Sequence, residues 1–262
     1  MLPFGVTDVE FAVVTYLSAF IGISLVIAAS GFIKVKYLAA FALGVYLWFF
    51  TDTLGGANYL DVNGGFAFSD YLLSLVVLFV IGIFVFFSLD RRVFAPGPAA
   101  FGALAVGALA GLAIGLHGGA EGADFGAFAA QTQSNSLIDA FGGIAPSVSW
   151  VFHKMLEPTV AAVAFVALAG NMKKPSERIV DALILAAVFV TPAVVGSVVG
   201  YYNPFDTTYI YALGLGASVY ALSRLGRSLY SDEAQSPSLS LKMALAAVIG
   251  FLLLFSSALL HS

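Results

Sequence analysis

Residues 69–89 read SDYLLSLVVLFVIGIFVFFSL, an almost unbroken apolar run with one charge near its start. A helix needs about 20 mostly apolar residues to cross the hydrocarbon core of a bilayer, so this stretch predicts a transmembrane helix. The whole chain has the same character, because 60% of its 262 residues are hydrophobic and only 10% are charged. Soluble domains are about 25% charged. The composition therefore excludes a soluble globular protein and predicts a polytopic membrane protein.

The same window finds eight candidate spans along the chain. Their approximate limits are 11–33, 38–55, 69–89, 100–129, 137–169, 179–201, 207–224 and 241–260. We therefore expect an all-α fold with eight transmembrane helices that form a single transmembrane domain over residues 1–262. No soluble domain of useful size is left over. Residues 1–10 carry no Lys or Arg before the first apolar run, so we expect the first helix to be retained and not cleaved as a signal peptide.

The cysteine count and the net charge exclude several classes of function. The chain has no cysteine and a formal net charge of -4. Disulfide frameworks, thiolate metal sites and iron–sulfur ligation are therefore excluded. A nucleic-acid-binding protein would need a basic patch on a soluble face, so we expect no nucleic-acid partner.

Basic residues predict which side of the membrane each loop faces. With eight crossings, every Lys and Arg except Lys154 falls on one side of the membrane. These residues are Lys34, Lys36, Arg91, Arg92, Lys173, Lys174, Arg178, Arg224, Arg227 and Lys242. The positive-inside rule makes this side cytoplasmic, so both termini are expected outside a cell membrane. The acidic residues expected outside are Asp8, Glu10, Asp61, Asp139 and Asp206.

A short internal repeat supports one arrangement of these spans. Residues 41–44 read FALG in the second span, and residues 211–214 read YALG in the seventh. Inverted repeats of three helices around a central pair would place the two segments in corresponding positions. Chance recurrence is the alternative, because small residues are common wherever membrane helices meet.

Two spans carry the same pair of ionisable residues. His117 and Glu121 lie in the fourth span, and His153 and Glu157 lie in the fifth, next to Lys154. Residues four apart lie on one face of a helix, so each helix offers an imidazole and a carboxylate that point the same way. Ionisable groups inside a bilayer cost a few kcal/mol each and need a partner. Two nitrogens and two carboxylates suit Zn²⁺, Fe²⁺ or Mn²⁺.

Two other interpretations of these pairs remain open. In the first, the His–Glu pairs are hydrogen bonds that hold two interior helices together. In the second, His117 and His153 bind a haem between them. The neighbouring backbone also invites two interpretations, because Gly118, Gly119, Gly122 and Pro158 could break helices around a cation path or could serve close packing and an ordinary kink.

At these residues the sequence resembles the ZIP family of divalent metal transporters. Residues 117–122, HGGAEG, are similar to that family's fourth-helix motif His-Asn-x-Pro-Glu-Gly, and residues 153–158, HKMLEP, are similar to its fifth-helix motif. Residues 191–196, TPAVVG, are similar to its sixth-helix pattern Glu-Pro-x-Gly-Ala. The resemblance implies eight spans, external termini and a central pair formed by the fourth and fifth helices.

The departures from the family's motifs imply a single metal ion. The positions that hold a second metal in the family are here Gly118, Lys154 and Thr191. The resemblance then implies a mononuclear site with four ligands, which are His117, Glu121, His153 and Glu157. Lys154 would lie between the two glutamates as an internal counter-ion.

Two more acidic residues could attract cations at the outer end of the path that leads to the metal site. Asp124 lies about one turn beyond Glu121, and Asp52 lies near the outer end of the second span. An acidic funnel raises the local cation concentration, although each residue could equally be a solvated helix end.

The resemblance predicts a transporter, not an enzyme, that carries a divalent cation into the cytoplasm. The alternative is a non-transporting structural or accessory subunit of a larger membrane complex, and a homodimer is also possible.

Overall fold

The computed structural model describes residues 6–56, 70–93, 99–134, 136–169, 175–230 and 241–261, and every regular element in these ranges is a helix. Side chains are described over slightly narrower ranges. The α-helices are α1 (Val6–Ala29), α2 (Val35–Gly56), α3 (Asp70–Val93), α4 (Ala99–Thr132), α5 (Leu137–Ala140), α6 (Ile144–Leu156), α7 (Thr159–Ala169), α8 (Pro175–Tyr202), α9 (Thr208–Tyr230) and α10 (Leu241–Ala258). A 3₁₀ turn, η3 (Leu259–His261), follows α10. Asp61, Lys173 and Lys174 lie outside the described residues.

The all-helical membrane class expected from the sequence is confirmed. Within the described ranges, 7 helices are long and apolar enough to cross a membrane, with α6 and α7 together forming one of them. The stretch expected as the seventh span is the helix α9, but it is not among these seven. Polar residues such as Ser218, Arg224 and Arg227 lie along α9 and make it less apolar than the other long helices.

One predicted boundary is wrong. The span expected over 137–169 begins only at Ile144, because residues 137–140 form the short helix α5 and a turn follows it. Gly142 and Gly143 have φ angles of 82° and 134° in this turn. Side chains rarely adopt such angles, so the glycine pair ends α5 and lets the chain turn back into α6.

The outer face of the bundle is apolar. Along α1 an exposed aliphatic residue recurs every four positions, and each of these side chains is 49–58% exposed. They are Val9, Val13, Leu17, Ile21 and Leu25. A soluble protein would carry polar residues on such a stripe. The stripe is the surface expected of a helix that faces lipid.

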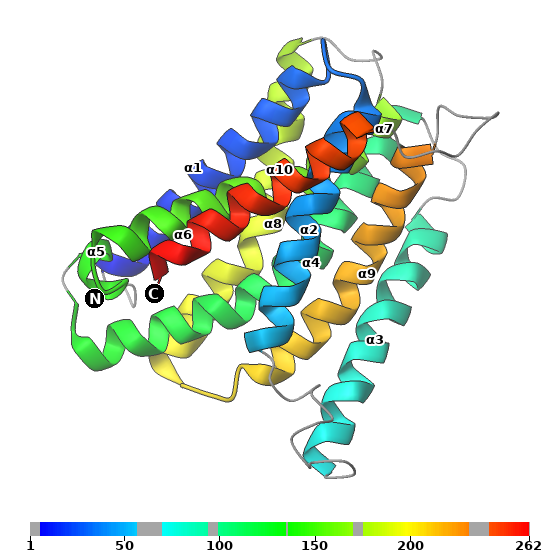
Figure 1. Ribbon diagram of the computed structural model, residues 1–262. Coiled ribbons are helices and arrows are strands. Elements are labelled where there is room, and N and C mark those ends of the chain that lie inside the picture. The colour runs from blue at the N-terminus through cyan, green and yellow to red at the C-terminus, as the bar shows by residue number, and fades with distance from the viewer. Residues whose placement is uncertain are drawn as a thin grey trace.

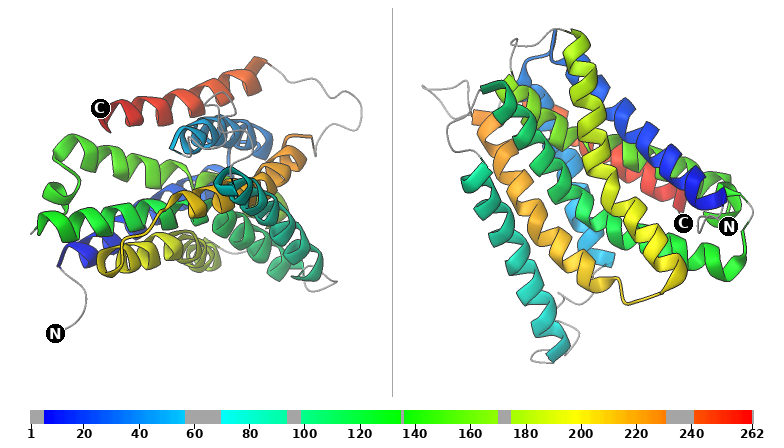
Figure 2. Two further views of the ribbon diagram at one scale, coloured as in Figure 1. Left: turned by 90° about the horizontal axis from the view of Figure 1, so that it is seen from below. Right: turned by 180° about the vertical axis from the view of Figure 1, so that it is seen from behind.

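The helix α4 lies at the centre of the bundle. It packs against α7, α8 and α9, whereas α2 packs between α9 and α10, and α1 lies against α6 and α8. The helix α3 lies at one edge and packs mainly against α9 (Figure 1). The start of α1 and the end of α10 lie at the same end of the bundle (Figures 1 and 2).

The two ends of the bundle differ in charge. Basic residues lie at the end away from the start of α1, in the turn before α2, at the ends of α3 and α9, and at the starts of α8 and α10. Those that the structure describes with side chains are Lys34, Lys36, Arg91, Arg178, Arg224, Arg227 and Lys242. At this end Arg224 forms an ion pair with Asp90 and links α9 to α3. The opposite end carries Asp8, Glu10, Asp52, Asp124, Asp139 and Asp206.

Glycines let α4 and α8 approach until their backbones touch. A Cβ atom on Gly122 would lie 2.0 Å from the carbonyl oxygen of Ala193, and one on Gly126 would lie 2.0 Å from that of Ser197. From the other side, a Cβ on Gly196 would lie 2.0 Å from the carbonyl oxygen of Gly119. The helix α4 runs without a break through these glycines. Of the two interpretations of the glycines, the structure therefore supports close packing.

Candidate metal site

The fourth and fifth spans bring together three side chains of types that can bind a metal. His117 and Glu121 project from one face of α4, with the imidazole Nε2 atom 3.4 Å from the Oε2 atom of Glu121. Glu157 lies at the junction of α6 and α7, and its Oε1 atom is also 3.4 Å from Nε2 of His117. One ligand atom from each of the three residues lies within 4.8 Å of the other two. A cation held by all three would have one nitrogen and two carboxylate ligands.

The backbone of α4 fixes the orientation of the His117 imidazole. Its Nδ1 atom is in hydrogen-bonding contact with the carbonyl oxygen of Ile114. A carbonyl can only accept, so Nδ1 carries the proton, and in the neutral ring the lone pair of Nε2 is free to accept from the Lys154 ammonium or to bind a metal. Phe49 of α2 packs edge-on against the imidazole, with 4.5 Å between ring centroids. A histidine held in this way is ready to bind a metal through Nε2.

The ammonium group of Lys154 lies among the same three ligands. Its Nζ atom donates to Glu121 Oε2 at 2.5 Å and to Glu157 Oε2 at 2.8 Å. It also lies 3.4 Å from His117 Nε2. Lys154 and His117 are each 1% exposed, and Glu157 is 3% exposed. The group therefore contains two carboxylates and one ammonium between helices, and of these the ammonium and the Glu157 carboxylate are buried.

An interruption in the fifth span positions Lys154 and Glu157. The helix α6 ends at Leu156 and α7 begins at Thr159, and Pro158, which has no N–H, lies between them. The Thr159 hydroxyl donates to the carbonyl oxygen of Leu156 at 2.5 Å and so satisfies a backbone group at the break. The carbonyl of Met155 lies against Gly22 of α1, where a Cβ atom would come within 1.8 Å of its oxygen.

His153 makes different contacts from the other predicted ligands. Its Nδ1 atom lies 3.0 Å from the carbonyl oxygen of Ser149 and 3.3 Å from the hydroxyl of Ser257 in α10. In the described part of the chain, it does not belong to the group formed by the three other predicted ligands. The contact with Ser257 joins α6 to α10, but its partner is a serine and not the glutamate of the helix-packing interpretation.

The two acidic residues predicted at the outer end of the cation path lie at the acidic end of the bundle. Asp124 is exposed and accepts hydrogen bonds from the hydroxyl groups of Thr207 and Tyr211 at 3.3 and 3.4 Å. Asp52 is exposed near the end of α2. The side chain of Glu121 is 23% exposed. This carboxylate is therefore the part of the buried group that solvent and ions can reach.

Four aromatic rings pack together beside Lys154, and sequence reasoning missed them. They are Phe11, Phe125, Phe141 and Trp150, with ring centroids of neighbours 4.3–5.3 Å apart. The Nζ atom of Lys154 lies 4.7 Å from the ring centroid of Trp150, whose indole N–H donates to Thr15 at 3.1 Å. The sequence carried a signal for this contact, because Trp150 precedes Lys154 by four residues and so shares its helix face.

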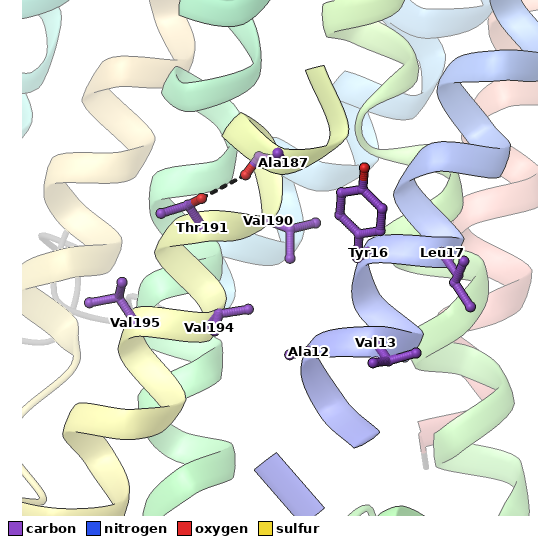
Figure 3. A pocket seen from close by; sticks show the side chains of 9 residues that line it. All are labelled: Ala12, Val13, Tyr16, Leu17, Ala187, Val190, Thr191, Val194 and Val195. Atoms are coloured by element: carbon purple, nitrogen blue, oxygen red, sulfur yellow. Dashed lines mark hydrogen bonds between the residues drawn. The ribbon is translucent and has the colours of Figure 1, made fainter. Parts of the chain in front are cut away.

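Thr191 lies apart from this group. It lines an apolar groove of about 420 Å³ between α1 and α8, and its hydroxyl donates to the carbonyl oxygen of Ala187 at 2.7 Å (Figure 3). Among the described residues it forms no hydrogen bond or ion pair with His117, Glu121, Lys154 or Glu157.

An apolar core separates the site from the basic end of the bundle. Between its start at the basic end and His117, α4 contributes buried small and aliphatic residues that pack against α7, α8 and α9. Members of this core include Ala103, Val106, Ala110, Ile114, Val163, Leu185 and Leu225. The site is therefore closer to solvent on its acidic side, through Glu121, than on its basic side.

Comparison with protein-family models finds no match for this chain, and comparison with curated proteins finds none either. The site therefore has to be interpreted from its own chemistry.

Proposed function

We propose that this protein is a permease that carries a divalent metal cation across the membrane through the site formed by His117, Glu121 and Glu157. The observation that carries the proposal is the meeting of one imidazole nitrogen and two carboxylates, from two different spans, inside the bundle. Such ligands suit Zn²⁺ best, and also Fe²⁺ or Mn²⁺. The chemistry is binding and release, and we propose no catalytic role.

The distribution of charge supports inward transport. The acidic end of the bundle offers Asp52, Asp124 and the partly exposed Glu121, which would concentrate cations near the site. The basic end would face the cytoplasm of a cell membrane by the positive-inside rule. Movement of the cation past the apolar core would then need the helices to rearrange, as in the alternating access of other transporters.

We include α9 as an eighth crossing in this proposal. Its 23 residues span about 34 Å at a rise of 1.5 Å per residue, and it packs alongside α2, α3 and α4. An even number of crossings agrees with the start of α1 and the end of α10 lying at the same end (Figure 1). Both termini would then be external, and an inverted pair of three-helix repeats would flank the central spans.

The proposal for the fourth ligand is His153. Its imidazole would have to move to join the other three ligands, because among the described residues the group of ligand atoms within 4.8 Å of one another does not include it. If His153 stays in place, water would complete the coordination of the metal.

One observation favours a second candidate function. Lys154 already contacts all three ligand residues, as a permanent structural cation would. In that case the protein is a structural or accessory subunit of a larger membrane complex and moves no metal.

Flux measurements on the purified chain separate the two functions. The protein is reconstituted into liposomes that contain a metal-sensitive dye, and Zn²⁺, Mn²⁺ or Fe²⁺ is added outside. We expect dye signal with the natural sequence, and its loss in the double variant His117→Ala, Glu157→Ala. Thr191→Val is the matched control, because Thr191 lies in the α1–α8 groove and should leave flux unchanged (Figure 3). Absence of flux with all three metals would favour the structural subunit.

A further inference from the structure

We propose that Lys154 is the resident cation of the site, and that an entering divalent cation displaces its ammonium group onto the face of Trp150. This inference rests on the proposed function, since it describes how the same site exchanges one cation for another.

The ammonium makes the contacts that a metal would make. A lysine ammonium has three N–H donors and no acceptor, and here there are three acceptors around it, on Glu121, Glu157 and His117. These three side chains are also the ones that could hold a metal. Each of the three N–H donors of Lys154 therefore has an acceptor in this group.

A metal and the ammonium cannot both use these ligands in the present geometry. Metal–oxygen and metal–nitrogen bonds to Zn²⁺ are about 2.0–2.2 Å long. The Nζ atom lies 2.5 and 2.8 Å from the carboxylate oxygens, so a metal bound there would nearly coincide with the ammonium, and their like charges would repel. Binding of a divalent cation therefore requires the ammonium to move.

Trp150 offers the ammonium a second position. The Nζ atom is already 4.7 Å from the centroid of its ring, within the range in which a cation is attracted to an aromatic face. The ring is held in place by the hydrogen bond to Thr15 and by Phe11, 5.2 Å away between centroids. The lysine stem is flexible and can change rotamer without movement of the helix. The ring of Phe189, 6.0 Å from Nζ, provides further aromatic surface.

Displacement makes Lys154 a competitor built into the site. Each metal ion that binds must do so against the ammonium, and each ion that leaves is replaced by it. The affinity for metal is thereby lowered, and the two carboxylates keep one compensating positive charge between transport events.

The first test measures metal affinity with and without the competitor. Mn²⁺ binding to the purified full-length protein is measured by titration calorimetry for the natural sequence, Lys154→Met and Lys154→Arg. We expect Lys154→Met to lower the Kd at least tenfold and Lys154→Arg to leave it weak, because arginine keeps the charge. An unchanged or higher Kd in Lys154→Met would overturn the inference. Absence of Mn²⁺ binding in every variant would reject the proposed function as well, so the two failures are distinguishable.

The second test keeps the buried charges intact, in case Lys154→Met fails to fold with two carboxylates left unpaired. The chain has only two tryptophans, so Trp48→Phe leaves Trp150 as the sole indole reporter. We expect Mn²⁺ to change the Trp150 emission as the ammonium moves onto the ring, with the same midpoint as the calorimetric titration. The further change Trp150→Leu, which leaves every charge in place, should raise the Kd several-fold. Saturation with Mn²⁺ without an emission change, or an unaltered Kd in Trp150→Leu, would overturn the inference.

Discussion

At the scale of single residues, Glu121 and Glu157 share one ammonium but differ in their surroundings. The Glu157 side chain is 3% exposed and that of Glu121 is 23% exposed. Removal of one partner from a buried ion pair costs about 3–5 kcal/mol, whereas pairs near solvent are worth much less. We therefore predict that Glu157→Gln lowers the unfolding midpoint in detergent clearly more than Glu121→Gln does. Similar midpoints for the two variants would show that burial does not set the strength of these pairs.

The sequence predicts part of this site through helical spacing. His117 and Glu121 are four residues apart on an uninterrupted helix, and their side chains do meet. Spacing alone does not predict which of His153 and Lys154 faces the pair on α4. The two are neighbours in sequence, and neighbours on a helix point about 100° apart at 3.6 residues per turn. The rotation of α6 decides which of them faces α4. That rotation depends on contacts with α1 and α10, such as the one between Met155 and Gly22, which the sequence does not reveal.

At the scale of helices, glycine contacts set the position of α4 relative to α8. We predict that Gly122→Ala lowers the unfolding midpoint, because its Cβ would lie 2.0 Å from the carbonyl oxygen of Ala193 and would push α8 away. The same movement should weaken metal binding at the adjacent Glu121.

Gly102→Ala is the matched control on the same helix. Nothing lies within 4 Å of its Cβ position, and alanine is better than glycine inside a helix by about 0.5–1 kcal/mol. We expect its midpoint in detergent to be unchanged or higher. Equal destabilisation by both substitutions would mean that loss of glycine itself, and not the α4–α8 contact, is responsible.

Helix boundaries were predictable where a residue type dictates the backbone. Pro158 marked the position of the interruption between α6 and α7, because proline removes a backbone donor wherever it stands, but it left a break and an ordinary kink both open. The turn after α5 carries an equally local signal, the pair Gly142 and Gly143. The predicted span ran through it because the residues on both sides are apolar. Glycines in α4 were ambiguous for the opposite reason, since their effect depends on the partner helix.

At the scale of the whole molecule, charge predicts the orientation in the membrane, and the absence of cysteine makes this easy to test. A single cysteine introduced at Phe32, in the turn between α1 and α2, lies at the basic end. One introduced at Asn203, between α8 and α9, lies at the acidic end. Both positions are exposed. We predict that a membrane-impermeant maleimide labels Asn203→Cys in intact cells but labels Phe32→Cys only after permeabilisation.

The reverse labelling pattern would invert the proposed orientation. Labelling of both positions in intact cells would place both turns on one side and would contradict the crossing pattern of the bundle. An added cysteine at Arg227, near the end of α9, tests the eighth crossing, because it should behave like Phe32→Cys if α9 spans the membrane.

The buried lysine also has a consequence for biosynthesis. Two carboxylates facing each other at membrane depth would repel and would make assembly of the bundle depend on the supply of metal, as zinc fingers depend on zinc. Lys154 is part of the same polypeptide, so the neutralising charge is made together with the carboxylates it serves. A newly made chain would therefore complete its assembly in the lipid bilayer without metal, so the proposed permease could be made when metal is scarce.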